Sequence, residues 1–93
     1  MGGVKDLILL VHDHIETELA GALPERIYSQ LEIGTDGHSL IVANQHGYKV
    51  CAECLIETGA IYVRTNTDTA FFTGTNCAGS AGRYIAYLME CDE

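Results

Sequence analysis

The amino-acid sequence predicts an α+β fold, a two-layer sandwich in which an N-terminal and a C-terminal helix pack on one face of an antiparallel sheet of four to five strands. Three observations support this. Both ends of the chain repeat apolar residues every three or four positions, as amphipathic helices do. The middle alternates with a period of two, as half-buried strands do. Short polar, glycine-containing turns join these strands as hairpins, which makes the sheet antiparallel. The 93 residues, 1–93, are expected to form one domain.

The first helix is predicted over residues 4–20, and Gly21 with Pro24 is predicted to end it. Residues 24–29 stay open between strand and short helix, because proline suits the first position of a helix as well. The helix is predicted from apolar residues at steps of three and four, namely Val4, Leu7, Ile8, Val11, Ile15 and Leu19.

The period of two begins at Ile27 and predicts a first strand that ends before a turn at residues 35–38. Further strands are predicted at residues 39–44, 48–57 and 60–66, with a short fifth at 70–73. In the longest strand the odd positions are expected to lie mostly in water. The even positions are expected on the core face, namely Tyr48, Val50, Ala52, Cys54 and Ile56.

The second helix is predicted over residues 76–90, with Thr75 or Asn76 as its cap. Its apolar stripe is predicted to be Ala81, Tyr84, Ile85 and Leu88. The core is predicted from the inward positions of all these elements, and comprises Val11, Ile15, Val50, Cys54, Ile61 or Tyr62, Ile85 and Leu88.

The composition limits the partners of the protein. Five Lys and Arg against thirteen Asp and Glu give a net charge of −8, which argues against direct contact with nucleic-acid backbones and against a polybasic membrane anchor. No run of apolar residues is long enough for a secretory signal or a membrane-spanning helix, so a cytoplasmic protein is expected. Free thiols are then favoured over disulfide bridges for its cysteines, which are Cys51, Cys54, Cys77 and Cys91.

Two motifs contain metal-ligand residue types. Cys51 and Cys54 form a CxxC pair, but positions three apart in a strand point to opposite faces, so two packing cysteines are favoured over a zinc site. His12 and His14 flank Asp13 on the first helix, where positions two apart diverge. Each histidine lies four residues before a glutamate, which favours solvated surface pairs over a metal or catalytic role. We therefore expect no metal and no cofactor.

A glycine-rich segment enters the second helix at residues 73–82. Its backbone N–H groups predict, as an alternative function, an anion- or nucleotide-binding domain or a small enzyme that uses Asn76, Cys77 and Gly79. The favoured interpretation is structural: a cap followed by small residues that let the helix approach the sheet closely.

The charge distribution favours a small acidic binding protein that inhibits or modulates a partner protein with a basic surface. A nucleic-acid-binding partner fits, because carboxylates then take the place of phosphates, and small acidic domains of this format occur among phage and mobile-element inhibitors. A homodimer through the exposed sheet is compatible with the same pattern. The residues predicted to contact the partner are Glu53, Leu55, Glu57, Tyr62, Asp13 and Glu16.

Overall fold

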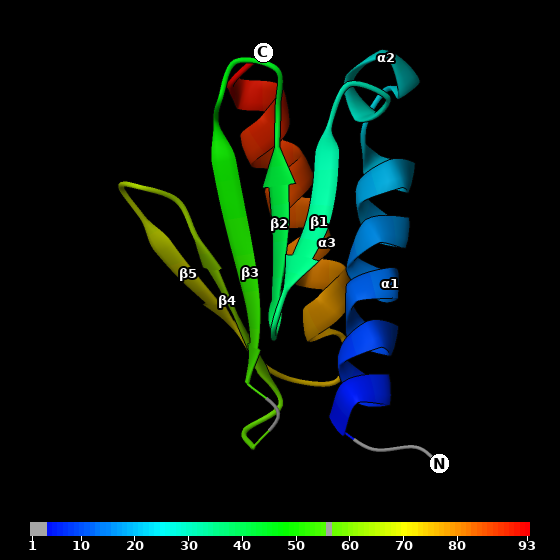
Figure 1. The fold of residues 1–93 in the computed structure, drawn as a ribbon, viewed down its shortest axis with the longest axis vertical. Helices are drawn as coiled ribbons and strands as arrows, with labels where there is room; N and C mark the ends of the chain where they lie inside the picture. Colours follow the sequence, from blue (N-terminus) through cyan, green and yellow to red (C-terminus); the bar gives the residue numbers. More distant parts are fainter. Residues whose placement is uncertain (1–3, 56) are drawn as a thin grey trace.

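Two long helices cover one face of a five-stranded antiparallel sheet, as the sequence predicts (Figure 1). The computed structural model describes residues 4–55 and 57–93. The strands follow one another in chain order, so β3 is central and β1 and β5 are the edges. Within the described residues, no helix has both the length and the apolar content needed to cross a membrane. The elements are α1 (Val4–Ala22), α2 (Glu25–Tyr28), β1 (Glu32–Asp36), β2 (Ser39–Ala43), β3 (Lys49–Leu55), β4 (Ala60–Arg64), β5 (Thr69–Phe72) and α3 (Cys77–Cys91).

The central strand has the predicted register. Val50, Ala52 and Cys54 are buried beneath the helices, whereas the odd positions lie on the opposite face, which we call the open face. Tyr48 precedes the strand and packs against the core. The open face carries its residues in rows across paired strands, such as Ser39, Glu53, Tyr62 and Phe71. The predicted core-facing Ile56 and the side chain of Val4 lie outside the described residues.

The core joins the helices to the sheet. Five predicted core residues are confirmed as buried: Ile15, Val50, Cys54, Ile61 and Ile85. Val11 and Leu88 are only partly buried against this core, and Tyr62 lies on the open face. In α3 the buried stripe is rotated from the predicted one, because the helix packs against α1 as well as the sheet. It consists of Ala78, Gly79, Ala81, Gly82, Ile85, Ala86 and Met89.

Several predicted boundaries were wrong. α1 passes through Gly21 and ends at Ala22, because a glycine without a positive φ continues a helix, and the chain turns only before Pro24. Residues 24–29 contain the short helix α2, with Pro24 as its N-cap. β1 therefore begins at Glu32 instead of near Ile27, and its hairpin turn is only two residues long.

The small residues of α3 allow a close approach to α1, not to the sheet as the sequence suggested. A Cβ atom added to Gly82 would lie 2.8 Å from the carbonyl oxygen of Ile15 and 2.7 Å from the Cβ of Glu18. Both helices run in the same direction and lie side by side (Figure 1). Gly82 therefore sets how closely the two helices pack.

Candidate partner-binding groove

An open groove of about 560 Å³ lies between α1 and the edge strand β1. We call it the acidic groove, because two carboxylates line it and no Lys or Arg side chain that the structure describes does. Its lining residues are Leu9, Leu10, His12, Asp13, Glu16 and Thr35.

The groove lies where a helix-facing position of the edge strand β1 stays exposed beside α1. Thr35 pairs with Leu40 in the sheet, so both side chains lie on the face that the helices cover. Leu40 is fully buried, yet Thr35 is exposed. α1 packs along α3 and lies on the β1 side of the molecule, next to the edge strand (Figure 1). The free edge of β1 thus borders the groove.

The wall that α1 provides is both acidic and apolar. Leu9 and Leu10 are 53% and 66% exposed, although both are large aliphatic side chains. Asp13 lies one helical turn after Leu9, and Glu16 lies two turns after it on the same side of the helix. Apolar side chains next to carboxylates, without a covering element, are typical of a surface that buries area on binding.

His12 lines the groove and is buried. The prediction that it is a solvated surface residue was wrong. It is only 3% exposed, because it lies on the buried stripe of α1 between Ile8 and Ile15. Its Nε2 lies 3.4 Å from the carbonyl oxygen of His38 in the β1–β2 turn. A carbonyl only accepts, so Nε2 is the donor in this contact. Nδ1 is buried without a hydrogen-bond partner among the described residues.

We expect the substitution His12→Leu to stabilise the protein by about 1 kcal/mol, because it removes a buried polar atom, Nδ1, that has no hydrogen-bond partner among the described residues. The His38 carbonyl keeps a donor, since it also accepts from the backbone N–H of Cys54 at 3.2 Å. Urea unfolding of both proteins measures the difference. A loss of stability would show instead that the Nε2 contact outweighs the unpaired Nδ1.

The other predicted contact residues lie elsewhere in the fold. Glu53 and Tyr62 face each other across β3 and β4 on the open face, and Leu55 lies on the same face. Glu57 is in the β3–β4 turn, because β3 ends two residues earlier than the predicted register needs. The groove thus contains Asp13 and Glu16, and the structure does not join them to the remaining four.

The open face is less acidic than its glutamate suggests. The carboxylate of Glu53 lies 3.8 Å from the guanidinium of Arg64, which offsets its charge. Next to this pair, the rings of Tyr62 and Phe71 are 4.7 Å apart, and Phe71 is 52% exposed. The face therefore offers an aromatic pair with nearly balanced charges. The acidic groove is the more complementary surface for a basic partner.

The thiol-based alternative has little support in the geometry. The Sγ atom of Cys77 donates to the carbonyl of Gly59 at 3.4 Å. The hollow beside it, about 190 Å³, is lined by apolar side chains, the Cys54 thiol and backbone, and within the described part of the chain it contains no acid or histidine. The side chain of Asn76 lies over Gly79, within 2.6 Å of where a Cβ would be, and makes no cap hydrogen bond. Among the described residues, none that lines this hollow is a base that could activate Cys77.

The CxxC pair is split by the sheet. Cys51 lies on the open face, where its neighbour on β4 is Arg64, and Cys54 lies in the core opposite Ile61. Burial, with smaller contributions from the nearby Cys77 and Glu53, raises the pKa of the Cys54 thiol to about 11. The two sulfur atoms therefore cannot bind one ion. All four cysteines are free.

One feature of the sequence pointed to the groove, but the apolar spacing of the helix did not include it. Leu9 and Leu10 are apolar but do not belong to the buried stripe, and both proved exposed. Comparisons of this chain with protein-family models, curated proteins and solved structures find no match, so the geometry of the groove is the basis for assigning a function.

Proposed function

We propose that the protein is a small acidic binding protein that holds a basic segment of a partner protein in the acidic groove and thereby inhibits or modulates that partner. One observation carries the proposal: Asp13 and Glu16 line a groove together with two exposed leucines, and none of the described Lys and Arg side chains lines it. Carboxylates complement Lys and Arg side chains, and the leucines supply apolar area that association buries.

The position of the groove favours an extended partner segment. Within residues 4–55 and 57–93, β2 is the one strand that pairs with β1, so the other edge of β1 offers backbone groups to an added strand. Apart from Ile33, the strand is exposed. An extended segment placed there has the edge of β1 on one side and the carboxylates of α1 on the other.

The charge of the whole protein supports the same kind of partner. A net charge of −8 on 93 residues attracts basic surfaces over a distance and speeds their encounter with the groove. A surface evolved to bind phosphates is one such partner, because carboxylates on the groove wall occupy the place of the nucleic-acid backbone. Inhibition then results from occlusion of that basic surface.

Site-specific photo-cross-linking tests the proposal. A photoreactive amino acid is placed at Leu10 in the groove or at Tyr87 on α3, two positions of closely similar exposure, 66% and 62%. We expect a stoichiometric partner to cross-link from position 10 and not from position 87. Adding Asp13→Lys and Glu16→Lys should remove the cross-link. Equal labelling from both positions, or labelling that survives the charge reversal, would contradict the proposed site.

A further inference from the structure

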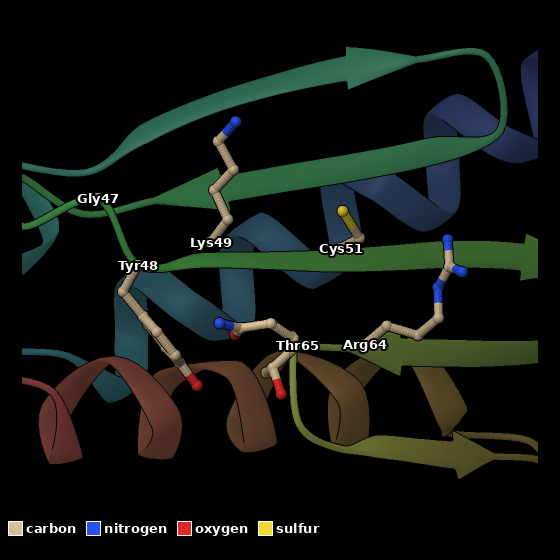
Figure 2. A pocket seen from close by; sticks show the side chains of 7 residues that line it. Gly47, Tyr48, Lys49, Cys51, Arg64 and Thr65 are labelled. Carbon is tan, nitrogen blue, oxygen red and sulfur yellow. The ribbon is translucent and has the colours of Figure 1, made fainter.

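A second hollow, of about 430 Å³, lies on the open face of the sheet where β3 begins and β4 ends (Figure 2). We call it the basic hollow, because it contains two cationic side chains in a protein whose net charge is −8. Its lining residues are Gly47, Tyr48, Lys49, Cys51, Arg64, Thr65 and Asn66.

The sheet register brings the two cations to the same side of the sheet. Lys49 and Cys51 are alternate residues of β3 and share the open face, and Arg64 pairs directly with Cys51 across β4. Figure 2 shows the side chains of Lys49, Cys51 and Arg64 extending to the same side, whereas Tyr48 and Thr65 point the other way. The Cys51 thiol is therefore flanked by a cation along its own strand and by another across the sheet.

Among the described Lys and Arg side chains, Lys49 forms no ion pair and Arg64 forms the longest one. Arg26 is bonded to Glu93, and Arg83 to Glu18 at 3.1 Å. Arg64 is 3.8 Å from Glu53, and Lys49 forms no ion pair within the described residues. A lysine on an edge strand often serves to prevent pairing with another chain. Lys49 lies on the central strand, so this structural role does not explain it.

We propose that the basic hollow binds the phosphate group of a small molecule. A phosphate or phosphate monoester carries nearly two negative charges at neutral pH, which matches one ammonium and one guanidinium group. The amide of Asn66 lines the same hollow and adds a hydrogen-bond donor. A long polyanion does not fit, because the strongly negative charge of the rest of the protein repels it.

Cys51 provides a probe inside the site. Its alkylation by iodoacetamide can be followed by mass spectrometry beside that of Cys91, which is exposed at the end of α3 and serves as a reference. Cys54 stays silent near neutral pH, because it is buried and the pKa of its thiol is raised to about 11. Inorganic phosphate is the first ligand, phenyl phosphate the second, and sodium chloride at equal ionic strength the control.

We expect inorganic phosphate to slow alkylation of Cys51 several-fold, saturating with a midpoint of about 1–10 mM, and to leave Cys91 unchanged. The exposed pair Lys49→Gln and Arg64→Gln should abolish this protection. The matched pair Arg26→Gln and Arg83→Gln, which removes the same charge elsewhere, should keep it. Stronger protection by phenyl phosphate would assign the site to a phosphate ester, and equal or weaker protection to free phosphate. Absence of protection in the unmodified protein, or protection that survives Lys49→Gln with Arg64→Gln, would overturn the proposal.

Discussion

Replacing Gly82 with alanine is expected to destabilise the protein by about 1–3 kcal/mol. The added methyl group would lie 2.8 Å from the backbone carbonyl oxygen of Ile15 and 2.7 Å from the Cβ of Glu18. Neither atom is the mobile end of a flexible side chain, so α1 and α3 have to separate. The fully buried Ile15 and Ile85 would then lose part of their packing. Urea or thermal unfolding measures the loss.

The substitution Gly21→Ala is the matched control. Gly21 is also helical, but nothing lies within 4 Å of where its Cβ would be. Alanine is the better helix former by about 0.5–1 kcal/mol at either position, so Gly21→Ala should stabilise the protein slightly. The difference between the two variants isolates the close helix approach. If Gly82→Ala is as stable as Gly21→Ala, the observed crossing of α1 and α3 is contradicted.

Reversing both groove carboxylates, with Asp13→Lys and Glu16→Lys, is expected to slow association with the basic partner on the order of tenfold to a hundredfold at low salt. Each substitution changes the local charge by two units on the groove wall, where the partner's cations are expected to lie. The effect should appear mainly in the association rate, measured by surface plasmon resonance or stopped flow with the cross-linked partner.

The pair Glu53→Lys and Glu57→Lys makes the same change in net charge elsewhere. It should reduce the association rate much less, since Glu53 is already offset by Arg64 and Glu57 lies in the β3–β4 turn. If this pair is the more damaging one, the partner binds at the open face, and the groove proposal is contradicted. Because both double variants change the net charge equally, a difference between their association rates shows which of the two surfaces binds the partner.

The fold class followed from the sequence because periodicity is a local property. The alternation of Val50, Ala52 and Cys54 with Lys49, Cys51 and Glu53 sets the two faces of β3 without information from the rest of the chain. Helix ends were less predictable. Gly21 has neither a positive φ nor a close neighbour, so nothing in its surroundings makes α1 end there.

The groove was harder to predict, because it depends on where one layer stops over another. Asp13 and Glu16 were correctly singled out as acidic helix residues, but their grouping with Glu53, Leu55 and Tyr62 had no geometric basis. Sequence alone does not show that α1 packs along α3 or that Thr35 of β1 stays exposed beside α1. His12 was misassigned for a related reason: its spacing fits the buried stripe, but its polarity suggested solvent.

The central claim is that an acidic groove attracts a basic partner, and the salt dependence of the association rate tests it most directly. The rate should be highest at low salt and should fall steeply as ionic strength rises past about 0.15 M, where the screening length is about 8 Å. The variant Asp13→Lys with Glu16→Lys should lose most of this dependence. A rate that does not change with salt, and that is equal in the variant, would contradict the account and leave an apolar interface in its place.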